Sequence, residues 1–250
     1  MNEAILIKNL TKHFNDKVIL NDVDLVVKKG EIYAFIGANG AGKTTLMKLL
    51  FGILKPDAGE ITLLGDALVQ NGENQIFSQI GNIIETPVFY NRLTATDNLE
   101  IHCSYMGKEF IKNIPDTLEL VGLVDLGDKK VGEFSLGMKQ RLAMARALIT
   151  KPQLLILDEP INGMDPMGIQ DTRNLLLKIN KEYGTAMLIS SHIISELAKM
   201  ADTVGIIDQG IMLDQRSAKD IYSELKEKDL ELEDYFRQAV IGGKANARFN

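Results

Sequence analysis

The stretch YAFIGANGAGKTTLMKLL, residues 33–50, sets three glycines and a lysine between two apolar segments. The apolar run before them stops at Gly37, and an apolar pattern with helical spacing resumes after Lys43. Glycines let the backbone curl so that successive N–H groups point inward and form a nest for an anion. A following helix adds the positive end of its dipole. The stretch therefore predicts a strand, a phosphate-binding loop and a helix.

The glycine loop fits the spacing G-x-x-x-x-G-K-[ST] from Gly37 to Thr44. In this pattern the lysine, here Lys43, supplies a mobile positive charge for the outer phosphates of a nucleotide. The hydroxyl of Thr44 can bind Mg²⁺. The alternative is a plain glycine-rich helix cap, which the strand before the loop and the helix after it disfavour.

Short apolar segments between turns predict strands, and longer stretches with helical spacing predict helices. Strands are expected at residues 5–10, 18–27, 32–36, 60–64, within 152–160, and at 185–190, 204–208 and 211–213. Helices are expected at residues 44–52, 141–149, 169–182 and 193–200, and the apolar spacing is mostly helical from 71 to 136. The charged tail from residue 217 is also helix-prone, and we expect its residues 242–250 to be frayed. This alternation is typical of an α/β fold with a largely parallel sheet, here interrupted by a helical insert.

The composition indicates a globular protein without an affinity for nucleic acid. Hydrophobic residues make up 45% of the 250 residues and the net charge is −6, so no nucleic-acid partner is expected. The single cysteine, Cys103, cannot form an intrachain disulfide, and we expect a packed thiol in a reducing cytoplasm. No segment reaches the roughly 20 apolar residues that cross a bilayer. A partner would have to hold this chain at a membrane.

Two acids end a buried strand in the segment LLILDEP, residues 154–160. In open parallel sheets, ligands bind beyond the carboxyl ends of the strands. Asp158 can bind the same Mg²⁺ ion as Thr44. Glu159 can face the side from which water attacks the terminal phosphate. A solvated pair of acids at a turn is the alternative explanation. The nearby phosphate loop favours the metal and base assignment.

A second anion site is predicted in EFSLGMKQRLAMARAL, residues 133–148. Ser135 and Gly137 begin a helix. The Ser135 hydroxyl and the free N–H groups of the helix start can bind an anion. One chain around one nucleotide does not obviously need two such sites. We therefore expect the second site to serve a nucleotide held by another copy of the chain.

These motifs resemble, in this order, those of the nucleotide-binding subunits of ABC transporters, over roughly residues 5–221. GANGAGKTT is similar to the Walker A loop, LLILDEP to Walker B and FSLGMKQR to the signature motif. NGMD, residues 162–165, resembles the D-loop. His192 in SSHII resembles the switch histidine, and Phe14 in TKHF has the place of an aromatic residue that stacks on adenine.

The resemblance implies a role for each matching residue. Glu159 would polarise the attacking water, and His192 would contact the terminal phosphate and link it to Glu159. Thr44 and Asp158 would bind Mg²⁺. The residues expected to bind ATP are Phe14, Gly37, Asn39, Gly40, Gly42, Lys43, Thr44 and Thr45, with Ser135 and Gly137 closing on the ATP of the opposite subunit and Asp165 joining the two sites.

The same resemblance implies a P-loop NTPase fold, with a RecA-like mostly parallel sheet, an N-terminal antiparallel β subdomain and an all-helical insert at about 82–134. The ATPase domain would span residues 1–221, followed by a helical tail at 222–250. The implied partners are a second copy, in an ATP-dependent head-to-tail dimer, and integral membrane permease subunits. We expect the permease at Thr86–Leu99, where Phe89, Tyr90 and Leu93 look exposed, on the inner face of the cell membrane.

Two departures from the family pattern point to one branch. Glu85 stands where the family usually has a glutamine, and a carboxylate binds Mg²⁺ more strongly than an amide. Leu136 and Met138 replace a glycine and a glutamine of the signature. Both features resemble lantibiotic-immunity and bacitracin-resistance transporters, which implies export of antimicrobial peptides. A plain surface acid is the alternative for Glu85.

Two other functions are compatible with part of the pattern. A soluble single-cassette ATPase, of the type that acts in iron–sulfur assembly, would use the same motifs. A P-loop kinase or GTPase would use the phosphate loop but leave FSLGM and His192 without a role. His13 and His102 are expected to be surface or structural residues rather than metal ligands. The charged tail is expected to present a solvated face, or else a regulatory or dimer contact.

Overall fold

The computed structural model describes residues 2–68 and 75–247. The strands are β1 (Glu3–Phe14), β2 (Lys17–Lys28), β3 (Ile32–Ile36), β4 (Ala58–Leu63), β5 (Asp66–Ala67), β6 (Ile80–Ile83), β7 (Leu154–Asp158), β8 (Ala186–Ser191), β9 (Thr203–Asp208) and β10 (Ile211–Ser217). The helices are α1 (Lys43–Leu50), α2 (Ala95–Met106), α3 (Ile114–Leu120), α4 (Leu136–Leu148), α5 (Pro166–Tyr183), α6 (Ile194–Ala198), α7 (Ala218–Lys228) and α8 (Leu232–Ala247). Short 3-10 turns are η1 (Gln75–Gln79), η2 (Lys108–Asn113) and η3 (Val131–Glu133).

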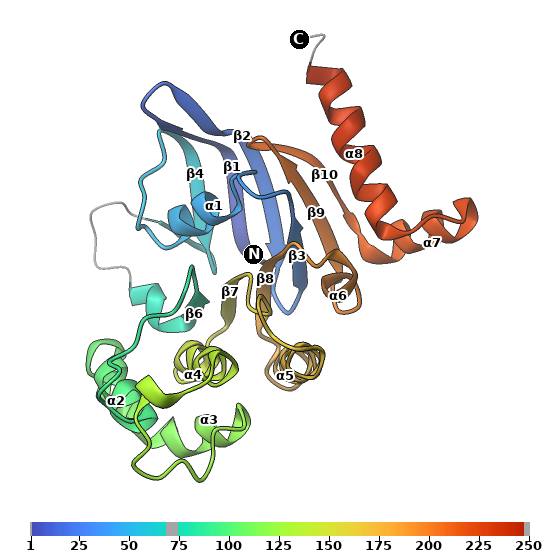
Figure 1. Ribbon diagram of the computed structural model, residues 1–250. Helices are drawn as coiled ribbons and strands as arrows, with labels where there is room; N and C mark the ends of the chain where they lie inside the picture. The colour runs from blue at the N-terminus through green and yellow to red at the C-terminus, as the bar shows by residue number, and fades with distance from the viewer. Residues whose placement is uncertain (1, 69–74, 248–250) are drawn as a thin grey trace.

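The strands form two sheets (Figure 1). An antiparallel sheet has the order β2-β1-β4-β5, and a six-stranded sheet has the order β10-β9-β3-β8-β7-β6. In the larger sheet β9, β3, β8, β7 and β6 run parallel to one another, and β10 pairs antiparallel with β9. This is the expected P-loop NTPase architecture, with an antiparallel sheet from the N-terminal strands.

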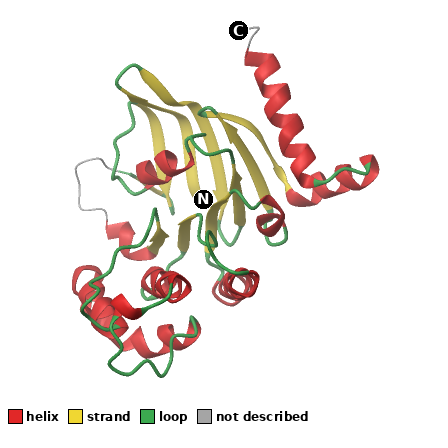
Figure 2. Cartoon of the chain, in the orientation of Figure 1, coloured by secondary structure: helices red, strands yellow, loops and turns green. Residues whose placement is uncertain are grey.

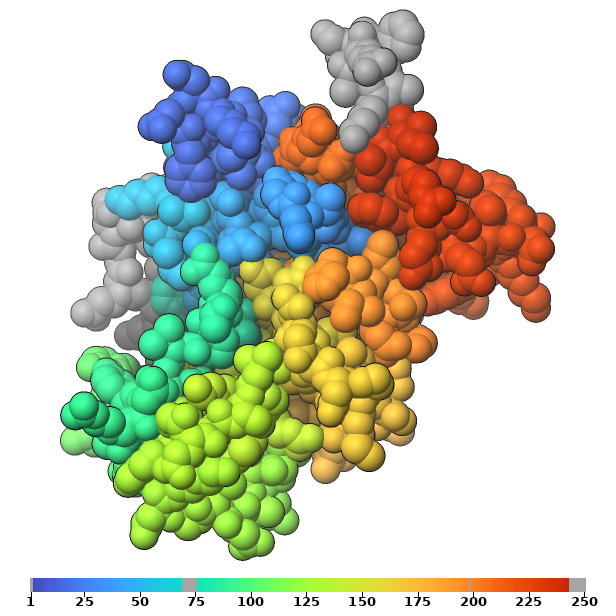
Figure 3. All heavy atoms as spheres, viewed as in Figure 1, coloured from blue at the N-terminus to red at the C-terminus, as the bar shows by residue number. Residues whose placement is uncertain are grey.

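The inner strands of the larger sheet are buried along their whole length because both faces are covered. One apolar cluster joins β1, β2, β3 and α1, and the other joins the larger sheet to α4, α5 and the tail. Figure 2 shows α2, α3, α4 and α5 gathered away from the antiparallel sheet. In the space-filling view the N-terminal strands form the top, and residues from about 85 to 150 form a lower lobe (Figure 3).

The region expected to be mostly helical, residues 71–136, contains a strand. β6 pairs parallel with β7, with Ile80 opposite Leu154, and forms the edge of the larger sheet. A Cβ at Gly81 would lie 2.0 Å from the carbonyl oxygen of Ala147, so the glycine lets α4 approach this strand. The helical interpretation was wrong there because a run of only four residues carries too little periodicity. Residues 71–74 lie outside the described residues.

The tail forms α7 and α8, and part of it is buried rather than a fully solvated face. Leu232 and Tyr235 of α8 are buried against the body of the protein, and the Tyr235 hydroxyl bonds to Asp214 of β10. Residues 242–247, expected to fray, continue α8, while residues 248–250 lie outside the described part. The apolar residues among the interleaved charges form this buried face.

Smaller differences concern helix starts. α4 begins at Leu136 rather than Arg141, and α5 begins at Pro166 rather than Ile169. Both helices begin one residue after a side-chain cap, Ser135 in one case and Asp165 in the other. Cys103 is buried, as expected. Among residues 2–68 and 75–247, no helix has the length and apolar character needed to cross a membrane.

Candidate functional site

The phosphate loop leaves β3 at Ile36 and enters α1 at Lys43. Gly40 and Gly42 have positive φ angles of 82° and 110°, a conformation that a side chain disfavours. A Cβ at Gly37 would lie 2.6 Å from the carbonyl oxygen of Ile207, so β9 packs directly behind the loop. The glycines are therefore required by backbone shape and by close packing, as the motif predicted.

Lys43 is a nearly buried cation, only 6% exposed. Its Nζ donates to the carbonyl oxygen of Gly37 at 2.7 Å and lies 3.8 Å from Oε1 of Glu159. The ammonium group is thus held inside the curl of the loop by a carbonyl oxygen. A phosphate oxygen is another acceptor that this ammonium group could bind.

The predicted metal ligands lie together although 114 positions separate them in the sequence. Thr44 Oγ1 donates to Asp158 Oδ2 at 2.6 Å, and Ser190 Oγ donates to Asp158 Oδ1 at 2.5 Å. Asp158 ends β7 and is buried. A hydroxyl and a carboxylate that converge at one point form the hard-oxygen donor set that Mg²⁺ prefers. The residues therefore fit a magnesium ion.

Glu159 and His192 form a second polar pair at the same edge of the sheet. His192 Nδ1 lies 2.8 Å from Glu159 Oε2, and the backbone N–H of His192 donates to the same oxygen at 3.2 Å. Glu159 has a left-handed backbone, φ 51°, held where its N–H donates to Ser190 Oγ at 3.0 Å. Such a strained residue is often found at functional sites. The arrangement holds the Glu159 carboxylate between the His192 ring and the Lys43 ammonium, at 2.8 and 3.8 Å.

A cleft of about 820 Å³ opens over these acids. Its walls include Thr44, Glu85, Asp158 and Glu159. Glu85 lies on the rim with its side chain 60% exposed, in an ion pair with Lys48 at 2.5 Å. The structure thus brings Glu85 to the cleft of the metal ligands, while its role as a metal ligand stays a prediction.

The start of α4 also reaches this cleft, through Leu136 and Gln140. Ser135 caps the helix, accepting from the N–H of Met138 at 3.3 Å, and Leu136 is 56% exposed. In the part of the chain that the structure describes, a Cβ added at Gly137 would meet no atom within 4 Å. This helix start therefore presents an open, uncovered surface, which a second molecule could approach.

The remaining predicted residues lie on several elements. Phe14 ends β1, is 45% exposed, and has the Lys12 ammonium 5.6 Å from its ring centre. Asn39 is exposed at the tip of the loop, and Thr45 is half-buried in the first turn of α1. Asp165 caps α5 by accepting from the N–H of Gly168 at 2.7 Å. The roles assigned to these residues stay predictions.

Sequence reasoning missed Ser190 and the contact that Gln140 makes. Ser190 is the last residue but one of β8, two positions before His192, and that place near the carboxyl edge of the sheet is the signal that could have found it. Its hydroxyl contacts both Asp158 and the N–H of Glu159. Gln140 Nε2 donates to the carbonyl oxygen of Asn162 at 2.5 Å, which joins α4 to the loop before Asp165.

Comparison with known proteins decides the family. The ABC transporter family model matches residues 20–162, more than half of the chain. The chain belongs to the ABC transporter family. An uncharacterised ABC transporter ATP-binding protein of Bacillus subtilis, YcbN, is 47% identical over 88% of this chain and 72% of its own length. The bacitracin transport ATP-binding protein BcrA of Bacillus licheniformis is 45% identical over 86% and 70%.

Two further similarities agree with this result. The lantibiotic transport ATP-binding protein SrtF of Streptococcus pyogenes is 43% identical over 82% of this chain and 86% of its own. A solved ATP-binding subunit of an ABC transporter superposes with a TM-score of 0.83 at 28% identity, covering 95% of this chain and 99% of the other. The predicted resemblance and the P-loop NTPase fold are confirmed.

The family assignment settles the choice between the three functions. The chain is the ATP-binding and ATP-hydrolysing subunit of an ABC system. A kinase or GTPase would not match this family, and the relatives named above are transport ATP-binding proteins or uncharacterised ABC transporter subunits, which disfavours the soluble cassette.

Proposed function

We propose that this subunit hydrolyses Mg²⁺-bound ATP to drive a separate membrane permease that exports an antimicrobial peptide of the bacitracin or lantibiotic type. The proposal for the cargo is supported by the names of the relatives BcrA and SrtF. The observation that carries the chemistry is the convergence of Thr44 with Asp158 and of His192 with Glu159 at one edge of the sheet. The chain would then work on the inner face of the cell membrane.

Each residue at this edge has a distinct task. The adenine would stack on Phe14, and Lys43 would exchange the Gly37 carbonyl oxygen for phosphate oxygens. Thr44 and Asp158 would hold the magnesium ion, which neutralises phosphate charge when bound. Glu159, oriented by His192, would take a proton from the attacking water.

We further propose a head-to-tail dimer in which Ser135 and Gly137 of one copy close on the ATP of the other. The open surface of the α4 start supports this, because none of residues 2–68 and 75–247 places an atom within 4 Å of a Cβ added at Gly137. Asp165 would lie between the two sites, held to α4 through the Gln140–Asn162 bond. A related bacterial ABC transporter cassette, MJ0796, 25% identical with a TM-score of 0.78 over 86% of this chain and 98% of its own, has been solved as a dimer.

The permease would bind at Thr86–Leu99. Val88 and Tyr90 are exposed there, whereas Phe89 is half-buried with the Arg146 guanidinium 5.0 Å from its ring centre, so the expectation of an exposed Phe89 was wrong. Leu93 is likewise half-buried.

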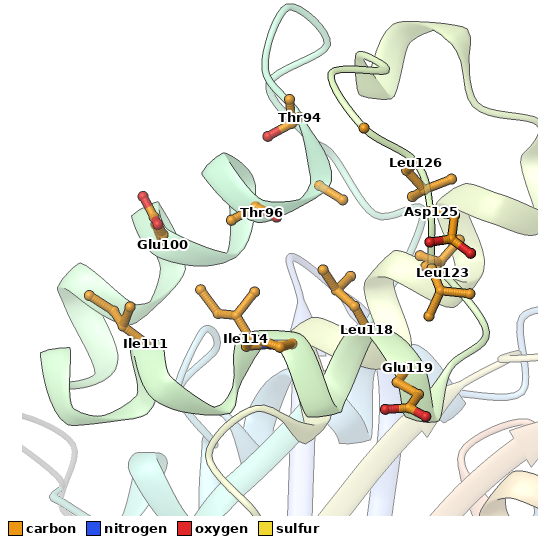
Figure 4. Close-up of a pocket in the computed structure, with 14 residues that line it drawn as sticks. Thr94, Thr96, Glu100, Ile111, Ile114, Leu118, Glu119, Leu123, Asp125 and Leu126 are labelled. Carbon is orange, nitrogen blue, oxygen red and sulfur yellow. The ribbon is translucent and has the colours of Figure 1, made fainter.

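Next to this segment, a groove of about 650 Å³ runs between α2 and α3 (Figure 4). Apolar side chains including Ile114 and Leu118 line it, and its charged lining residues are all acidic: Glu100, Glu119 and Asp125. An apolar groove with an acidic rim fits a short amphipathic permease helix with basic flanks. Cysteines at Val88 and Tyr90 should crosslink to a cytoplasmic loop of the permease. A crosslinking scan without any such product contradicts docking at Thr86–Leu99.

The decisive experiment replaces Glu159 by glutamine. The variant should bind ATP with near-normal affinity while turnover falls roughly 10²–10⁴-fold, because the positioned base is lost. Steady-state phosphate release and nucleotide binding measure the two effects. Glu182→Gln, an exposed acid on α5, is the matched control and should leave both unchanged.

The cargo is tested in the host cell with the same variants. A strain carrying only Glu159→Gln should become more sensitive to bacitracin-type or lantibiotic peptides, and the Glu182→Gln strain should not. Normal resistance in the Glu159→Gln strain would remove the peptide cargo from the proposal. Normal turnover by the purified variant would remove Glu159 from the chemistry.

A further inference from the structure

One ion pair connects the helix after the phosphate loop to the rim of the cleft. Lys48 Nζ lies 2.5 Å from Oε1 of Glu85. Lys48 belongs to the last turn of α1, four residues after Thr44, so the two side chains project from neighbouring positions on one helix face. The pair therefore holds the Glu85 carboxylate about one helical turn away from the Thr44 hydroxyl.

The charge balance of the cleft explains why Glu85 needs a cation. Asp158 and Glu159 line the same cleft, where Lys139 is the one cationic lining residue among those described, and ATP adds further negative charge. A third free carboxylate there would be repelled by its neighbours. Glu85 also has a left-handed backbone, φ 60°, which non-glycine residues keep only where surrounding contacts restrain them. The Lys48 ammonium supplies both the opposite charge and a restraint.

We propose that Lys48 is a positioning residue that competes with the metal ion for the Glu85 carboxylate. In the nucleotide-free chain Lys48 holds Glu85 back at the rim. When Mg²⁺ binds between Thr44 and Asp158 together with the nucleotide, Glu85 leaves Lys48 and turns to the metal and its water shell. This inference rests on the proposed function, because it presupposes a metal ion at Thr44 and Asp158.

The test measures metal affinity without turnover. Mn²⁺ is titrated into each protein in the presence of ADP, and free Mn²⁺ is followed by electron paramagnetic resonance. The four proteins are the wild type, Lys48→Met, Glu85→Gln and the double variant. Lys48→Met should tighten Mn²⁺ binding roughly three-fold more in the wild-type background than in the Glu85→Gln background, which is the range of an exposed ion pair.

The double-variant comparison removes the other effects of losing Lys48. The positive charge of Lys48 repels a bound metal ion even without contact. The same charge, in the last turn of α1, stabilises that helix. Both effects are present in the two backgrounds and cancel in the difference. A purely structural loss would weaken Mn²⁺ binding or leave it unchanged, and it would not depend on Glu85.

Three further proteins make the result decisive. Lys48→Arg should behave as the wild type because it keeps the charge. Lys48→Gln replaces Lys48→Met if the latter folds poorly, and it should have the same effect on Mn²⁺ binding. Lys228→Met breaks a comparable pair, Lys228–Glu224 at 2.6 Å, far along the chain on α7 and should change nothing.

Equal effects of Lys48→Met in both backgrounds, or weaker Mn²⁺ binding, overturn the competition. Failure of the wild type to bind Mn²⁺ with ADP would instead contradict the proposed function itself.

Discussion

At the scale of single residues, one serine organises both acids of the site. The Ser190 hydroxyl donates to Asp158 and accepts from the N–H of Glu159, so it fixes the proposed metal ligand and the proposed base at once. All of these groups are at or near the end of a buried strand. A buried polar group that loses its partner costs roughly 1–3 kcal/mol. The geometry of catalysis and part of the stability therefore depend on the same hydroxyl.

Ser190→Ala should lower turnover by about 10–100-fold, because the Asp158 carboxylate and the Glu159 backbone both lose a partner. The unfolding free energy should fall by about 1–3 kcal/mol. Steady-state ATPase assays and urea unfolding measure the two losses.

Ser191→Ala is the matched control for that variant. Ser191 is equally buried, but its hydroxyl accepts only a local bond from the N–H of Ile193, at 3.0 Å. It should lose stability with little loss of turnover. Equal turnover losses in the two variants would show that Ser190 has no special place in the site.

At the scale of elements, the junction between α2, α4 and the edge strand β6 holds a titratable group. His102 of α2 lines a pocket with Arg146 of α4 and with Phe51 and Phe77, whose rings stack at 5.7 Å. Burial, helped by the positive charge of Arg146, lowers the pKa of His102 to about 4. His102 is therefore neutral in the folded protein at neutral pH, in agreement with a structural role.

This pKa predicts acid sensitivity of the junction. The unfolded chain binds a proton at His102 below pH 6.5, while the folded chain does so only near pH 4. Neutral His102 therefore contributes fully to the free energy of unfolding above pH 6.5, and this contribution is lost as the pH falls towards 4. We expect a loss of about 1–3 kcal/mol, reduced from the full shift because the side chain is partly exposed.

His102→Gln should remove that part of the pH dependence. Urea unfolding at pH 7.5 and pH 5 gives the difference for the wild type and for the variant, and common carboxylate effects cancel between them. An identical decline in both proteins would mean that His102 is not the group responsible.

At the scale of the whole molecule, the start of α4 offers a surface that the described residues leave uncovered. Among these residues no atom lies within 4 Å of a Cβ added at Gly137, and the phosphate loop lies on a different element. In the proposed dimer the helix start would complete the site of the other copy. A change there should consequently alter assembly without altering the fold of the single chain.

Gly137→Ala tests this separation. Alanine favours a helix over glycine by about 0.5–1 kcal/mol, so the isolated chain should be as stable as before or slightly more stable. The added methyl group should obstruct the partner's ATP, so that ATP-dependent dimerisation and turnover both fall at least 10-fold. Light scattering after size exclusion, in a Glu159→Gln background, measures the dimer.

Gly242→Ala is the control, because Gly242 is also helical and its added Cβ would meet nothing within 4 Å. It should leave the dimer and turnover unchanged. A fully active, dimer-forming Gly137→Ala protein contradicts the head-to-tail closure.

The sequence by itself determined the phosphate loop, the acids at the end of β7 and the α/β class. These features are local: glycine spacing, an apolar run and a terminal acid are all readable within a few residues. The short strand β6 was missed because four residues carry no clear period. The buried face of α8 was missed because charged residues surround its few apolar ones.

Only the tertiary structure decided which distant residues meet. The order of strands places Ser190 beside Asp158, from 32 positions away, and brings Lys48 to Glu85, from 37 positions away. Strand order and helix placement depend on packing of the whole core, which no local pattern encodes. The sequence therefore predicted which groups would do the chemistry, whereas the fold decided which neighbours hold them in place.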